Sequence, residues 1–114
     1  MSITSVLIGF STRQSASRFE EATKDPVGTQ TQKILAMVKK NADTEYGKKY
    51  GFSSIETIED YQRQVPVINY EDIKADMARV IQGSKKVFTA EDPVMFAQTS
   101  GTTGKPKVIP VTPT

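Results

Sequence analysis

Two short apolar runs near the end of the chain flank nine polar residues, and this pattern constrains the fold more than any other. Residues 94–98 are mostly apolar and follow Pro93, and residues 108–111 are rich in β-branched side chains, as strands are. The run between them, TSGTTGKPK, contains four hydroxyl groups, two glycines and two lysines. The sequence therefore predicts a strand, a polar loop over residues 99–107 and a second strand.

The composition of this loop suits a phosphate group. Glycine allows a ligand to approach the backbone closely, and successive N–H groups in a tight turn can bind an anion. The loop is not a Walker A motif, because Thr99 and Pro106 stand where that motif requires Gly and Ser or Thr, and because a strand follows rather than a helix. An ordinary hairpin loop without a ligand is the alternative. The complete run, with a lysine on each side of Pro106, favours a phosphate-binding loop over an ordinary hairpin loop.

The run from Thr99 to Lys107 resembles the ATP-phosphate loop of the adenylate-forming superfamily. Four further blocks narrow the resemblance: FEEATKDP at residues 19–26, NADTEYGKKYGF at 41–52, VP at 65–66 with YEDI at 70–73, and KVIP at 107–110. In this order they resemble the auxin-responsive acyl acid–amido synthetase family. The resemblance covers residues 16–112.

This resemblance implies an α/β enzyme, of which the chain is a mainly α-helical N-terminal piece that ends in the strand–phosphate loop–strand unit. Residues 1–15 would form an N-terminal arm. Residues 16–114 would begin the large adenylate-forming domain, with helices over 16–83 and the strands within 94–112. The family's enzymes have a large and a small domain, far more than 114 residues. We therefore expect the rest of the enzyme to be missing and the piece alone to be inactive.

In the family, the intact enzyme activates a carboxylic acid with ATP, forms an acyl-adenylate and transfers the acyl group to an amine such as an amino acid. The resemblance implies ATP as a cofactor and Mg bound with its phosphates. An acyl-CoA ligase that uses CoA as acceptor is one alternative, and a non-catalytic helical binding module with a phosphate loop is another. The positions that match the family's loop are Thr99, Ser100, Gly101, Thr102, Thr103, Gly104 and Lys107.

Within this set, the resemblance implies that the hydroxyl groups of Ser100, Thr102 and Thr103 contact ATP phosphates. It also implies that Gly101 and Gly104 let the backbone approach the ligand closely, and that Lys107 supplies a positive charge. Lys105 lies at a variable position and is expected to be peripheral. No metal ligand and no further catalytic residue is identified in the chain.

Charge and composition argue against several other classes of protein. A net charge of +2 indicates neither a nucleic-acid nor a membrane partner. The chain has no cysteine for a disulfide and no histidine for a Ser-His triad. The apolar residues 6–10 are too few for a membrane helix, and no basic residue precedes them as in a signal peptide. We expect a cytoplasmic protein.

Helix signals occupy the first 83 residues. A capping-box spacing at Ser17 predicts a short helix to about Thr23 with Phe19 packed inward, after a loosely held arm over residues 1–14. Asp25-Pro26 opens the strongest predicted helix, which ends near Asn41. Its predicted core face consists of Val27, Thr31, Ile34, Leu35, Val38 and Ala42.

Three further helices are predicted after the long one. The first begins around residues 43–45, carries Tyr46 and Tyr50 on one face and has Gly51 as its cap; the second begins at Thr57. Asn69 caps the third, over residues 70–81. Its predicted inner face is Tyr70, Ile73, Met77, Val80 and Ile81. Glu71 and Asp72 point in different directions on this helix, so they are assigned to helix stabilisation rather than to a catalytic pair.

Overall fold

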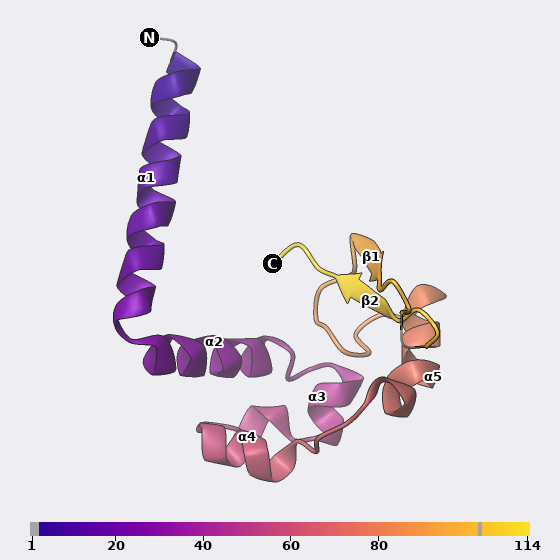
Figure 1. The fold of residues 1–114 in the computed structure, drawn as a ribbon. Coiled ribbons are helices and arrows are strands. Elements are labelled where there is room, and N and C mark those ends of the chain that lie inside the picture. The colour runs from indigo at the N-terminus through magenta and orange to yellow at the C-terminus, as the bar shows by residue number, and fades with distance from the viewer. Residues whose placement is uncertain (1–2, 103) are drawn as a thin grey trace. The chain divides into compact units, whose positions relative to one another are not determined.

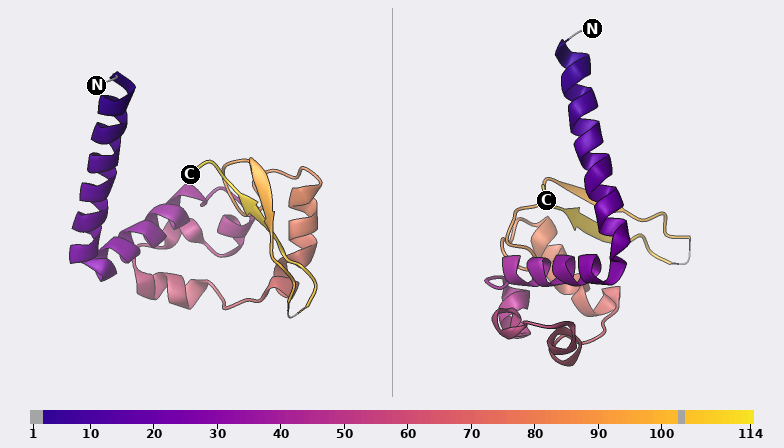
Figure 2. Two further views of the ribbon diagram at one scale, coloured as in Figure 1. Left: turned by 45° about the horizontal axis from the view of Figure 1, so that its top comes forward. Right: turned by 90° about the vertical axis from the view of Figure 1, so that its left-hand side faces the viewer.

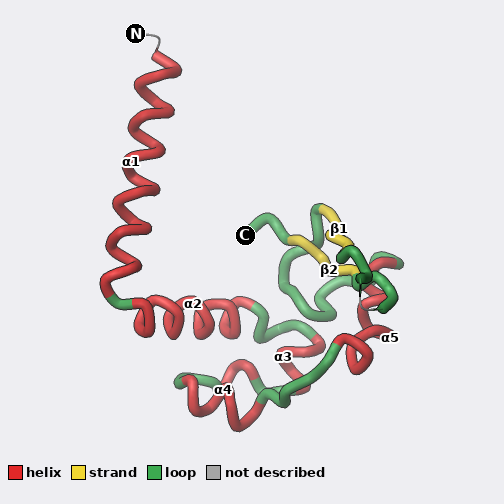
Figure 3. Tube along the Cα trace, in the orientation of Figure 1, coloured by secondary structure: helices red, strands yellow, loops and turns green. Residues whose placement is uncertain are grey.

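The computed structural model describes residues 3–102 and 104–114, which form a mainly helical chain with one small sheet (Figure 1). The helices are α1 (Ile3–Lys24), α2 (Pro26–Lys40), α3 (Glu45–Lys49), the 3-10 helix η1 (Phe52–Ser54), α4 (Ile58–Gln64) and α5 (Tyr70–Ile81), and the strands are β1 (Met95–Gln98) and β2 (Val108–Val111). Residues 1–34 and 35–114 form two separate compact units. The predicted order of helices followed by two strands is confirmed (Figure 3).

In the first unit, α1 corrects two predictions. One continuous helix replaces the loose arm and the short capped helix, so Ser17 lies inside α1, and Phe19 is 71% exposed rather than packed inward. The Thr12 and Thr23 hydroxyls donate to the carbonyl groups of Gly9 and Glu20 within the helix. No proline interrupts α1, and it ends before Pro26, which disfavours helical backbone in the residue that precedes it.

The beginning of α2 confirms its predicted signal. The Asp25 carboxylate accepts a hydrogen bond of 3.0 Å from the Gly28 N–H, as an N-cap residue does. Val38 on the predicted core face is buried, whereas Val27, at the other end of that face, is 74% exposed. The helical period therefore places the stripe correctly, but only the stripe's C-terminal part reaches a core.

Capping residues set the beginnings of α3, α4 and α5, and those of α4 and α5, Thr57 and Asn69, are the ones predicted. Thr44 accepts from the Gly47 N–H at 2.9 Å and is fully buried. Thr57 and Asn69 each complete a capping box, in which the third helical residue is an aspartate. The ring centroids of Tyr46 in α3 and of Tyr50, which caps the end of α3, lie 4.6 Å apart. Gly51 follows in the left-handed backbone conformation (φ 65°) that ends the helix.

The core of the second unit is small and gathers side chains from several short elements. Its buried apolar residues are Val38, Phe52, Ile55, Met77, Val80 and Val87. Ile81 is 50% exposed, so the predicted inner face of α5 extends one residue too far. Val87 lies in the connector between α5 and β1, where the sequence predicted neither a helix nor a strand. The N–H groups of Glu45 and Tyr46 donate to the carbonyls of Lys86 and Val87, which ties this connector to α3.

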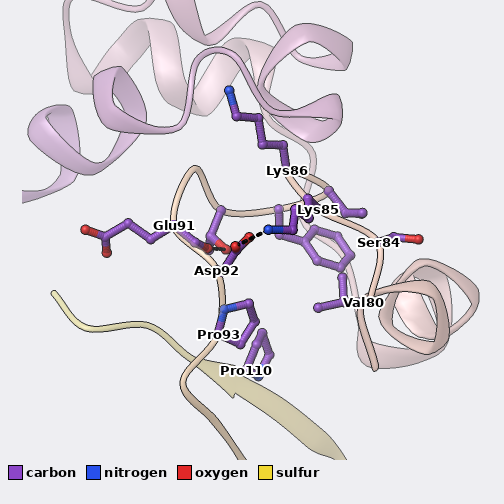
Figure 4. A pocket seen from close by; sticks show the side chains of 11 residues that line it. Val80, Ser84, Lys85, Lys86, Glu91, Asp92, Pro93 and Pro110 are labelled. Atoms are coloured by element: carbon purple, nitrogen blue, oxygen red, sulfur yellow. Dashed lines mark hydrogen bonds and ion pairs between the residues drawn. The ribbon is translucent and has the colours of Figure 1, made fainter. Parts of the chain in front are cut away.

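The end of the connector leads into the hairpin. Lys85 and Asp92 form an ion pair of 2.7 Å across the connector, and Pro93 lies beside Pro110 of β2 (Figure 4). β1 and β2 are antiparallel, in a register that runs from Met95 opposite Val111 to Gln98 opposite Val108. α5 makes its broadest contact with β2, and Figure 2 shows the hairpin beside this helix.

No helix among residues 3–102 and 104–114 combines the length and apolar character needed to cross a membrane.

Candidate functional site

The loop over residues 99–107 connects the two strands, and hydrogen bonds join its ends. The Thr99 N–H donates to the Lys107 carbonyl at 2.9 Å, and the Lys107 N–H donates to the Thr99 hydroxyl oxygen at 2.9 Å. Thr99 thus closes the loop with both its backbone and its side chain. The sequence placed Thr99 among the ligand contacts and did not predict this structural role.

Gly101 makes the turn inside the loop. Its backbone is left-handed (φ 69°), and its carbonyl accepts from the Gly104 N–H at 3.2 Å. A Cβ atom at this position would lie 2.9 Å from the Gly104 carbonyl oxygen and 3.0 Å from Cγ of Pro106. Both backbone conformation and space therefore require glycine here.

A hollow of about 380 Å³ lies at this loop. Its lining consists of Glu71, Thr99, Ser100, Gly101, Thr102, Gly104, Lys105 and Lys107. The structure thus brings together six of the seven predicted site residues, and the seventh, Thr103, lies outside the described residues. Lys105, predicted to be peripheral, also lines the hollow.

The second helical residue of α5 contributes the acidic group of this hollow. Glu71 pairs with Lys74 at 3.2 Å along the helix, in agreement with its predicted role in helix stabilisation. Its position in the lining was not predicted, because it follows from the packing of α5 beside the hairpin. Asp72 instead belongs to the capping box of α5.

Tyr70 joins α5 to the strand that leaves the loop. Its hydroxyl accepts from the Val108 N–H at 3.1 Å and donates to the Val108 carbonyl at 3.3 Å. The ammonium nitrogen of Lys107 lies 5.9 Å from the centroid of the Tyr70 ring. The helical period predicted an inward Tyr70, but no local signal indicates the partner of its hydroxyl.

The described residues offer no ready set of metal ligands. They contain no group of three His, Cys, Asp or Glu side chains that could hold a metal ion. Glu71 alone supplies a carboxylate to the lining of the hollow. The protein side chains near the loop thus do not by themselves fit the magnesium ion that the resemblance implies.

The carboxylates with shifted pKa values lie outside the hollow. A hydrogen bond from Arg79 lowers the pKa of Glu45, and one from Lys40 lowers that of Glu91. The Thr57 hydroxyl is the main cause of the lowered pKa of Asp60 in its capping box. These shifts mark ion pairs and a helix cap rather than a proton-transfer site.

Comparison with known proteins decides the family. The sequence pattern of the GH3 family N-terminal domain matches residues 15–114. The chain belongs to the GH3 family. This confirms the resemblance to the auxin-responsive acyl acid–amido synthetases and its position at the N-terminal end of their sequence.

Relatives in plants extend the assignment. Two indole-3-acetic acid-amido synthetases of Arabidopsis thaliana are similar to this GH3 chain. GH3.4 is 30% identical over 80% of the chain, and GH3.3 is 32% identical over 83% of it. The jasmonoyl–L-amino acid synthetase GH3.5 of Oryza sativa subsp. japonica is 30% identical over 88% of it. The chain spans 16% of each Arabidopsis relative and 18% of the rice one.

A solved structure supports the fold. The structure titled AtGH3.15 acyl acid amido synthetase in complex with 2,4-DB superposes on 74% of this GH3 chain and 15% of its own, with a TM-score of 0.67 and 29% sequence identity. The mainly helical arrangement with a two-stranded sheet is therefore that of the N-terminal region of a GH3 amido synthetase.

Proposed function

We propose that this GH3 chain is the N-terminal part of an ATP-dependent ligase, which activates a carboxylic acid as an acyl-adenylate and transfers the acyl group to an amine such as an amino acid. Residues 16–114 would be the start of its large domain, and the cytoplasm its expected location. The observation that carries the proposal is the hollow at residues 99–107, where hydroxyls, a glycine turn and two lysines lie together. The family supplies the reaction class, because its relatives are named amido synthetases.

The chemistry of the loop fits the departure of pyrophosphate from ATP. Negative charge develops on the leaving group, and oriented donors together with a cation stabilise it. The hydroxyls of Ser100 and Thr102 would donate to phosphate oxygens, as would that of Thr103, and the turn at Gly101 would allow close approach. Lys107 would supply the positive charge, since its backbone is fixed by Thr99 at the end of the loop.

The names of the relatives favour an amine over the thiol of CoA as the acceptor. Each is named an amido synthetase or a jasmonoyl–L-amino acid synthetase, so the bond that it forms is a carbon–nitrogen bond. An acyl-CoA ligase with the same adenylation step is the second candidate. The two differ in whether an amino acid or CoA consumes the acyl-adenylate.

ATP–pyrophosphate exchange tests the proposal in a GH3 protein of the relatives' length that begins with this sequence. Carboxylic acids are screened first, and Lys107→Ala is then compared with Lys105→Ala as the matched control. A charge-assisted hydrogen bond contributes about 1.5–3 kcal/mol, so Lys107→Ala should lower the efficiency with ATP by about one to two orders of magnitude. Lys105→Ala should have a much smaller effect.

Unchanged melting temperatures would exclude unfolding as the cause of any loss. Full exchange in Lys107→Ala would contradict the role of Lys107. ATP binding without exchange for any acid would favour a non-catalytic binding module.

A further inference from the structure

The side chain of Tyr70 holds both backbone groups of one residue at the base of the loop. Its hydroxyl contacts the N–H and the carbonyl of Val108, at 3.1 and 3.3 Å. Val108 is the first residue of β2 and pairs with Gln98, the last residue of β1. The hydroxyl of α5's first residue thus fixes the strand where it leaves the loop.

The same side chain also lies under the cation of the loop. The ammonium of Lys107 is 5.9 Å from the centre of the Tyr70 ring, a distance at which a cation is attracted to an aromatic face. The N–H of Lys107 is meanwhile bonded to Thr99. The backbone of Lys107 and its charged end therefore both have defined partners.

We propose that Tyr70 is a positioning residue for the phosphate site, which fixes Val108 with its hydroxyl and holds the Lys107 ammonium at the hollow with its ring. This inference rests on the proposed function, since it concerns the same loop. A free lysine side chain loses much rotamer freedom when it binds a ligand. A lysine that is already placed loses less, and therefore binds phosphate more tightly.

The two parts of Tyr70 can be separated by substitution. Tyr70→Phe keeps the ring and removes the hydroxyl, and Tyr70→Leu removes both. Tyr61→Phe is the matched control, because it makes the same change in α4. The probe is inorganic tripolyphosphate, which is titrated into the 114-residue chain and followed by calorimetry.

We expect Tyr70→Phe to weaken tripolyphosphate binding by about two- to tenfold, the range that one or two ordinary hydrogen bonds allow. Tyr70→Leu should weaken binding further, and Tyr61→Phe should leave it unchanged. Far-ultraviolet circular dichroism checks the helices of each variant. Tyr70→Phe decides the role of the hydroxyl even where Tyr70→Leu does not fold.

Proton NMR gives a readout that general destabilisation does not mimic. The ring should shift the terminal methylene protons of Lys107 upfield in the wild type and in Tyr70→Phe, and this shift should vanish in Tyr70→Leu. The Val108 amide should exchange with solvent faster in Tyr70→Phe and Tyr70→Leu than in the wild type.

The outcomes separate this inference from the proposed function. If the wild type binds tripolyphosphate, Lys107→Ala binds it weakly and both Tyr70 variants bind like the wild type, Tyr70 does not position the site and this proposal alone is overturned. If the wild type does not bind tripolyphosphate, the role of Tyr70 is overturned, whereas the proposed function is decided separately by ATP–pyrophosphate exchange in the longer protein.

Discussion

Gly101 shows how closely one residue controls the shape of the loop. Its φ of 69° and the nearby Gly104 carbonyl leave no room for a side chain. Gly101→Ala should therefore abolish the response of residues 99–107 to tripolyphosphate in an NMR titration, while the helical circular dichroism is kept. Gly9→Ala in α1, where the added atom would meet nothing within 4 Å outside its own helix backbone, is the control and should leave the response of the loop unchanged. A normal response in Gly101→Ala would show that the loop binds in another conformation.

Among the residues that the structure describes, Lys86 is the one residue other than glycine with a positive φ, at 53°. A left-handed conformation costs a residue with a Cβ about 1–2 kcal/mol, and glycine is free of this cost. After subtraction of glycine's own entropy loss, Lys86→Gly should raise the free energy of unfolding by up to about 1 kcal/mol. Lys85→Gly should lower it, because Lys85 has an ordinary backbone and pairs with Asp92. Urea denaturation measures both, and a loss of stability in Lys86→Gly would contradict the expectation.

Capping residues and the glycine-rich turn were predictable because their hydrogen bonds reach only a few residues along the chain. Thr57 and Asn69 contact residues three positions away. The hydroxyl of Tyr70 instead finds Val108, 38 positions away. Sequence spacing therefore identified the members of the loop, but the residue that anchors it required the packing of α5 beside the hairpin.

Among the elements, α5 carries a test of the core. Met77 is 5% exposed and Ile81, four residues later, is 50% exposed. Met77→Ala should lower the free energy of unfolding by about 2–5 kcal/mol, as removal of a large core side chain does. Ile81→Ala should cost far less, since half of that side chain is already in solvent. Chemical denaturation measures the free energy of unfolding of the two variants. Equal losses of stability would mean that the buried face of α5 is assigned wrongly.

Helix α1 shows where reading one element from sequence fails. Residues 3–24 lack a clear apolar stripe, so periodicity gave no reason to extend a helix before Ser17. The structure forms one helix there, in which no proline intervenes before Pro26 and the hydroxyls of Thr12 and Thr23 donate to backbone carbonyls. α2 was predicted well for the opposite reason, since it has both an N-terminal cap and a stripe.

For the whole molecule, carboxylates with lowered pKa values make the stability of the fold depend on pH. Glu45, Asp60 and Glu91 bind protons less readily in the folded chain than their usual pKa values of 4.5, 3.8 and 4.5 imply. Their contributions are therefore present at neutral pH and are lost as the pH falls below about 5 and through the lowered folded pKa values. The melting temperature should fall over that range.

Glu45→Gln should flatten this pH dependence by removing the Arg79 pair, whereas Glu59→Gln, an exposed change on α4, should not. Melting curves between pH 6 and pH 3 test this, at low salt so that screening is small. A melting temperature that rises on acidification would contradict the assigned pKa directions.

The central claim is that residues 99–107 bind the phosphates of ATP. Residue-resolved NMR of the chain during an ATP titration tests it most directly, because each backbone N–H reports separately. The account predicts saturable shifts for the amides of Ser100, Gly101, Thr102 and Gly104, with no change across α4 (Ile58–Gln64). Loop amides that stay unchanged at millimolar ATP, or saturable shifts centred elsewhere in the chain, would contradict it.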